Sequence, residues 1–165
     1  MDGRILMDVL LAQEQALILP AFDETVAHDL GSAIFADAAA CRARVVVDIR
    51  SASRRLFFAA LPGSTPDNED WARRKGNVVL RFHASSLRIG LKLEGEKRSA
   101  WPDAGLHPKE YAVHGGGFPV TVRDSGMVAS IAVSGLPSRD DHELITAVLA
   151  RRLNVPPITL KGLAH

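Results

Sequence analysis

The chain has 165 residues, of which 47% are hydrophobic and 24% charged, and its formal net charge is +1. These values are ordinary for a soluble protein of one domain, and they exclude a global electrostatic field for nucleic acid or an anionic membrane. The one cysteine, Cys41, excludes an internal disulfide and a cysteine-rich zinc site. The chain starts without a secretory signal pattern and has no run near the roughly 18 apolar residues of a membrane span. We therefore expect a cytoplasmic protein with no membrane or nucleic-acid partner.

Secondary structure is predicted from the spacing of apolar residues, because helices and half-buried strands repeat with different periods. In chain order, the predicted elements are a helix over 4–15, an extended segment over 17–19, a helix over 23–42, a hairpin of strands over 45–49 and 56–61, a helix from Pro66 through Phe82, a short helix over 86–93, an irregular connection over 94–113, a hairpin of strands over 120–123 and 128–133, and a helix from 138 to 153.

Two helix starts carry clear capping signals. Thr65 is predicted to cap the helix that begins at Pro66, since proline suits the first helical position. Ser138 is predicted to cap the last helix, with Asp141 at the capping-box position.

The order of elements predicts one α+β domain over residues 1–165. Hairpins dominate, so the sheet should be mainly antiparallel, with helices packed on its faces. Residues 154–165 are expected to form a tail or an oligomer arm. No P-loop and no dinucleotide-binding glycine motif occurs in the chain.

A glycine-rich loop, His114-Gly115-Gly116-Gly117, precedes the second hairpin and is the strongest candidate site. Glycine lets other groups approach the main chain closely, so the loop could bind a polar or anionic ligand on its amides, or it could simply turn the chain. The loop superficially matches the oxyanion loop of esterases, but the nucleophile motif G-x-S-x-G is absent. His114 could serve as a metal or haem ligand, as a general base, or as a structural histidine.

The start of the Pro66 helix is a second candidate. Asp67, Asn68, Trp71, Arg74 and Lys75 follow each other there. A helix N-terminus offers free amides and positive potential to an anion. The alternative is a well-capped helix with a solvated basic face and Trp71 as a core residue, and this alternative is slightly favoured.

Asp140, Asp141 and His142 are consecutive, so they cannot all face one ion from a helix. His142 could still join another element in space. The remaining histidines have no metal-binding spacing, and we expect no dedicated metal site.

The chain resembles the GlcG/HbpS-like family, often labelled a haem-degrading domain, over roughly residues 5–153. The resemblance rests on an ordered set of segments: 47–50, 60–68, Trp71, 74–75, 77–79, 81–82, 85–86, 114–119, 133–137 and 140–142. It implies a five-stranded, mainly antiparallel sheet flanked by helices in a profilin-like layout, assembly into a homo-oligomer, and haem as a cofactor candidate. No haem ligand of the family is carried over to this sequence.

Three functions follow as hypotheses. The first is a module that binds a small ligand, either haem or a small anionic metabolite. The second is a structural protein that acts through the surface of its homo-oligomer. The third is a small-metabolite enzyme with His114 as acid/base and Arg50 or Arg74 as its charge partner. The predicted ligand-binding residues are His114, Gly115, Gly116, Gly117, Asp67, Asn68, Trp71, Arg74, Lys75, Ser134, Gly135 and His142.

Overall fold

The structure is a computed structural model that describes residues 2–163. Its elements, in chain order, are α1 (Asp2–Ala16), β1 (Ile18–Leu19), α2 (Glu24–Ala40), β2 (Val46–Arg50), β3 (Arg55–Ala60), α3 (Pro66–Phe82), α4 (Ser86–Gly95), β4 (Gly117–Val122), β5 (Gly126–Ser134) and α5 (Ser138–Leu153). All predicted helices and both predicted hairpins are confirmed. The first difference is that β4 begins at Gly117, inside the glycine-rich loop, and not at Val120.

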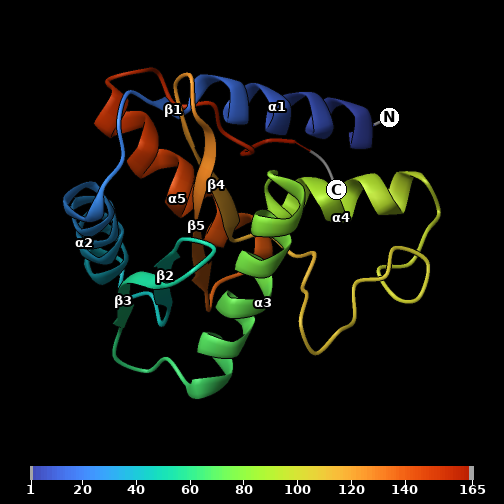
Figure 1. Ribbon diagram of the computed structural model, residues 1–165, viewed down its shortest axis with the longest axis horizontal. Coiled ribbons are helices and arrows are strands. Elements are labelled where there is room, and N and C mark those ends of the chain that lie inside the picture. The colour runs from blue at the N-terminus through green and yellow to red at the C-terminus, as the bar shows by residue number, and fades with distance from the viewer. Residues whose placement is uncertain (1, 164–165) are drawn as a thin grey trace.

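One five-stranded sheet forms the centre of the molecule, with the strand order β1-β4-β5-β2-β3 (Figure 1). The pairs β2–β3, β2–β5 and β4–β5 are antiparallel, and only the short β1 runs parallel to its neighbour β4. The predicted five-stranded, mainly antiparallel sheet is therefore confirmed. Joining the two hairpins through β2 and β5 brings the end of β5 next to the start of β2, where Ser134 lies opposite Val46.

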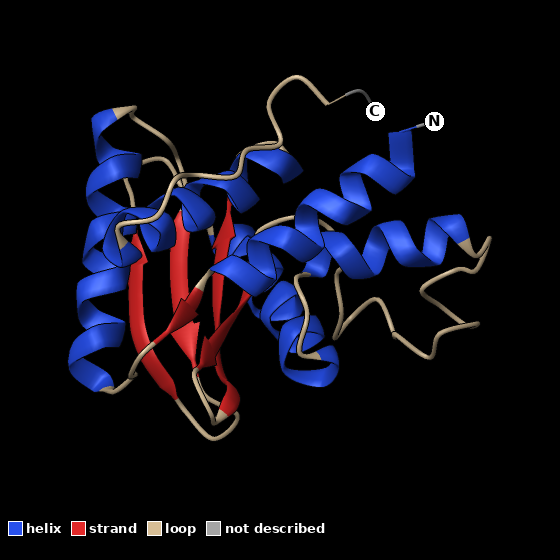
Figure 2. Cartoon of the chain, turned by 90° about the horizontal axis from the view of Figure 1, so that it is seen from above, coloured by secondary structure: helices blue, strands red, loops and turns tan. Residues whose placement is uncertain are grey.

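Helices cover both faces of the sheet (Figure 2). On one face, α2 and α5 pack against alternate strand residues such as Val47, Ile49 and Ile131, which form the main core. On the other face, α3 packs Ala72 against Val46 and Ala132. Both faces of β2 are buried, which explains its nearly continuous β-branched sequence. Within residues 2–163, no helix is long and apolar enough to cross a membrane.

The C-terminal segment after α5, expected as a tail or oligomer arm, packs back on its own chain. Leu160 is only 2% exposed and lies with Leu6, Leu10 and Leu87 in a cluster between α1 and α4. The amide of Gln13 donates to the carbonyl of Ile158 over 2.7 Å, which ties the segment to α1. The segment therefore contributes to the fold of the same chain.

Candidate functional site

A cavity of about 290 Å³ lies between the N-terminal half of α3, the glycine-rich loop and the start of α5. Seven of the twelve predicted ligand-binding residues line it, and Leu136, Ser138 and Asp141 complete its wall. Gly115, Gly116, Gly117, Arg74 and His142 do not line it. The lining residues are Asp67, Asn68, Trp71 and Lys75 from α3, His114 from the loop, Ser134, Gly135 and Leu136 from the end of β5, and Ser138 and Asp141 from α5.

The capped start of α3 aims one side of the helix at the cavity. Thr65 is the N-cap, as predicted, and its backbone N–H donates to the Asn68 side chain over 2.9 Å. Proline at the first helical position fixes the entry of the chain. Asp67, Trp71 and Lys75 are four residues apart, so they follow each other along the same face.

Trp71 forms the aromatic wall of the cavity and is held from two sides. The imidazole of His114 meets the indole nearly at right angles, with ring centroids 5.2 Å apart. The guanidinium of Arg74 lies 4.1 Å from the indole centroid, and its Nε donates to Asp70 over 2.8 Å. Arg74 thus acts behind Trp71, as a support for the ring.

His114 lines the cavity and remains exposed to solvent. Burial lowers its pKa below the usual 6.5, and the nearby charges of Lys75 and Arg74 lower it further. The imidazole is therefore neutral at pH 7. A neutral imidazole can accept a proton or a hydrogen bond from a bound molecule.

A buried ion pair joins α3 to α5 at the cavity. Lys75 Nζ donates to Asp141 Oδ2 over 2.9 Å and to the Val133 carbonyl over 3.0 Å, and the two charged side chains are 4% and 1% exposed. Burial lowers the pKa of Lys75 and raises the pKa of Asp141, while the attraction between the two charges opposes both shifts. The alternative interpretation of α3 was a capped helix with a solvated basic face. That face is not fully solvated, because Lys75 is buried between α3 and α5.

Asp141 does not serve in a capping box with Ser138, so that prediction is wrong. The N-cap of α5 is Pro137, and the Asp141 carboxylate accepts from the N–H groups of Gly135 and Leu136, the latter over 3.0 Å. The carboxylate does not cap the helix because Lys75 and these two N–H groups already bind it. Asp141 lines the cavity but was not among the predicted ligand-binding residues. Its position five and six residues after Leu136 and Gly135 was the available signal, because this spacing lets its carboxylate reach their N–H groups.

Two of the three glycine amides are engaged within the chain, and none of the three glycines lines the cavity. The Gly115 N–H donates to the Ser138 hydroxyl, and the Gly117 N–H donates to the Ser86 hydroxyl over 2.9 Å. Gly116 has φ +118°, and a Cβ there would lie 2.3 Å from the Val133 carbonyl oxygen. The glycines are thus needed for close packing, which holds His114 at the cavity.

His142 does not line the cavity that holds His114. Its side chain is 0% exposed, and its Nε2 lies 2.8 Å from the Gln13 side-chain oxygen. Because Gln13 donates its amide to Ile158, its oxygen faces His142, and Nε2 of the imidazole must carry the proton. Burial lowers the pKa of His142 to about 3. Among the residues that the structure describes, no three His, Cys, Asp or Glu side chains are grouped to hold a metal.

These features define a small α/β domain with a polar cavity beside one end of its central strands. The chain belongs to the HbpS-like family, whose model, described as haem degrading protein HbpS-like, matches residues 22–150. Curated relatives include UPF0303 proteins of Mesorhizobium japonicum, 48% identical over 87% of this chain and 86% of the relative, and of Burkholderia pseudomallei, 44% identical over 97% of both.

Solved structures share the fold. The Ybr137w protein is 29% identical with a TM-score of 0.83 over 90% of this chain and 88% of that one. A double mutant of HbpS from Streptomyces reticuli has a TM-score of 0.65 at 24% identity, covering 80% of this chain and 86% of its own. A PduOC–haem complex has a TM-score of 0.66 at 16% identity, covering 81% and 94%. At such low identity, the last two establish the fold alone.

Proposed function

We propose that this protein is a binding module for a small polar metabolite that carries an acidic group, held in the cavity between α3, His114 and α5. The observation that carries the proposal is the convergence of Trp71, His114 and Lys75 on one cavity from two separate segments. Titratable groups with shifted pKa values are concentrated at functional sites, and three of them line this cavity: Lys75, His114 and Asp141.

The charge balance of the cavity favours an acidic ligand. Both carboxylates in the wall are already compensated: Asp141 by Lys75 and two backbone N–H groups, and Asp67 by the positive end of the α3 dipole. His114 has no such partner among the described side chains and can take up a proton when an anion arrives. The ligand must be small, because the cavity is at the lower end of the roughly 300–1,000 Å³ typical of ligand pockets.

Haem does not fit this cavity, although a haem complex exists for one protein of the same fold. A porphyrin needs apolar contacts on both faces, whereas seven of the ten lining residues have polar side chains and the apolar wall consists of Trp71 and Leu136. We expect that adding haem to the purified protein gives no Soret shift that depends on His114. The measurement compares absorption spectra of the wild type and His114→Ala. A shift present in the wild type and lost in the variant would contradict this expectation.

The binding proposal is tested by thermal unfolding with a panel of small carboxylic acids and phosphates. A ligand at 100 times its Kd stabilises the native state by about 2.7 kcal/mol, which raises the Tm by roughly 5–10 °C for a chain of this length. The shift should be larger at pH 5.5 than at pH 7.5, because the lowered pKa of His114 means that protonation, which favours an anion, occurs only in acid.

His114→Ala should abolish most of the Tm shift and its pH dependence. The matched control is His28→Ala, which removes an exposed histidine of α2 that does not line the cavity. The proposal fails if no acid or phosphate raises the Tm of the wild type, or if His114→Ala responds like the wild type.

A further inference from the structure

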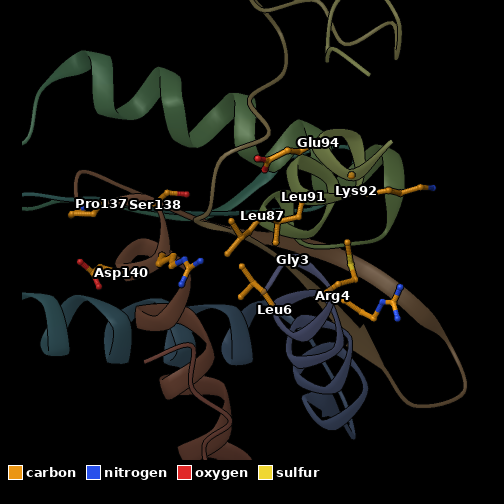
Figure 3. A pocket seen from close by; sticks show the side chains of 13 residues that line it. Gly3, Arg4, Leu6, Leu87, Leu91, Lys92, Glu94, Pro137, Ser138 and Asp140 are labelled. Atoms are coloured by element: carbon orange, nitrogen blue, oxygen red, sulfur yellow. The ribbon is translucent and has the colours of Figure 1, made fainter. Parts of the chain in front are cut away.

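Ser138 lines two hollows of the described chain, and they differ in the groups that they leave open to a ligand. In the larger one, between α1, α4 and the start of α5, Leu6 and Leu87 point toward each other (Figure 3). These leucines are buried with Leu160 in one cluster of the same chain, so they offer no open apolar floor. The smaller hollow is the His114 cavity, whose polar groups are only partly engaged within the chain.

The carboxylate of Asp67 lines the His114 cavity without a counter-charge. Within residues 2–163 it forms no ion pair and no hydrogen bond, whereas Asp141, the other carboxylate of the wall, is bound by Lys75. Asp67 follows Pro66 in the first turn of α3, where the positive end of the helix dipole offsets about half of a unit charge. The negative charge that remains at the cavity wall favours a cationic group on the ligand.

Asn68, the next residue, provides hydrogen-bond donors beside this carboxylate. Its Oδ1 accepts from the backbone N–H of Thr65 over 2.9 Å and from the Thr65 hydroxyl over 3.2 Å. These two donors identify the oxygen of the amide, so Nδ2 is the atom left without a partner among the described residues. Asn68 lines the cavity, and its Nδ2 can therefore donate to an acid group of the ligand.

His114 adds a second contact for the acid group, close to Asp67. Its ring meets that of Trp71 with centroids 5.2 Å apart, and Trp71 lies one helical turn after Asp67 on the same face of α3. One turn rises about 5.4 Å, so the groups for a cation and for an acid are close together along the helix. A molecule that reaches both must carry its amino and acid groups near each other, as an α-amino acid does.

We propose that the ligand of the His114 cavity is a small α-amino acid, whose ammonium group pairs with Asp67 and whose carboxylate accepts from Asn68 and His114. This inference rests on the proposed function, because it names the ligand class of the same cavity. A zwitterion satisfies the groups of both signs, whereas a simple carboxylic acid leaves Asp67 unpaired. Trp71 and Leu136 form the apolar wall for the side chain of the amino acid.

Isothermal titration calorimetry with matched ligands tests the ligand class. L-alanine, L-serine and L-leucine are titrated beside L-lactate, L-glycerate and L-leucate, which carry a hydroxyl in place of the ammonium group, and beside ethylamine, which lacks the acid group. The wild type should bind at least one amino acid about tenfold or more tightly than its hydroxy analogue, because the charge-assisted hydrogen bond to Asp67 is lost in the analogue. Ethylamine should bind more weakly than alanine by a similar factor.

Asp67→Asn should remove the preference for the ammonium group by weakening the binding of the amino acid but not that of the hydroxy acid. Glu69→Gln is the matched control and should keep the wild-type preference. It removes the same charge from the first turn of α3, at a residue that pairs with Arg55 and does not line the cavity.

Equal affinity of the wild type for amino acids and hydroxy acids would overturn the amino-acid assignment and leave the binding of acids at His114 intact. A preference that persists in Asp67→Asn, or that is also lost in Glu69→Gln, would show that Asp67 does not read the ammonium group. Ethylamine bound as tightly as alanine would overturn the contact with the acid group. A wild type that binds none of the acids, with or without an amino group, would overturn the proposed function as well.

Discussion

Lys75→Met is expected to lower the free energy of unfolding by about 3–5 kcal/mol at neutral pH, because it leaves the carboxylate of Asp141 buried without its counter-charge. Asp141 is 1% exposed, and the two backbone N–H groups that remain do not replace a full positive charge. Methionine keeps the unbranched shape of the lysine stem, so the loss reports on the charge more than on packing. Urea unfolding followed by circular dichroism measures it.

The matched control is Arg73→Met on the same helix. Arg73 pairs with Asp70 and Glu110 near the surface, where the loss should be about 1 kcal/mol or less. Lys75→Met/Asp141→Asn removes both charges of the buried pair and keeps an oxygen for the Leu136 N–H, so it should be more stable than Lys75→Met alone. A single variant that costs less than about 1 kcal/mol would show that the pair is hydrated in solution.

The second large effect is acid destabilisation through His142. The unfolded chain binds a proton on this imidazole near pH 6.5, whereas the folded chain does so only near pH 3. Between these values the unfolded state binds more protons, so stability falls as the pH falls, by about 1.4 kcal/mol per pH unit and about 5 kcal/mol in total. Above pH 6.5 the contribution is complete and constant.

His142→Gln tests this, since a glutamine amide can still donate to Gln13 but does not titrate. The difference in unfolding free energy between wild type and variant should change with pH between 6.5 and 4 at close to the full slope. His107→Gln is the matched control, because it makes the same substitution at an exposed histidine outside the core. A parallel pH dependence of wild type and His142→Gln would contradict the prediction.

Local elements were predictable because local signals decide them. The cap at Asp23, whose side chain accepts from the Val26 N–H, and the proline start of α3 depend on a few neighbouring residues. The strand order was not predictable from periodicity. The pairing of β2 with β5 joins residues that are 80 to 88 positions apart in sequence, and only the family resemblance implied the sheet as a whole.

The segments that form the candidate site could be predicted from the sequence, but the chemical roles of their residues could not. The start of α3 and His114 do share a cavity. The roles of single groups depended on contacts that sequence spacing does not contain. The hydroxyls of Ser86 and Ser138 accept from two of the three glycine amides, and Gln13, on a helix far away in the sequence, binds the imidazole of His142.

Ser138 lines the His114 cavity, and its hydroxyl accepts from the Gly115 N–H and so fixes the backbone of the glycine-rich loop. A ligand that displaced this hydroxyl would release the Gly115 N–H and loosen the loop that carries His114. Thermodynamic linkage then requires that ordering of the loop change the ligand affinity by the same factor as the ligand changes the ordering of the loop. Measuring hydrogen exchange at the Gly115 amide over a range of ligand concentrations would give that coupling free energy directly.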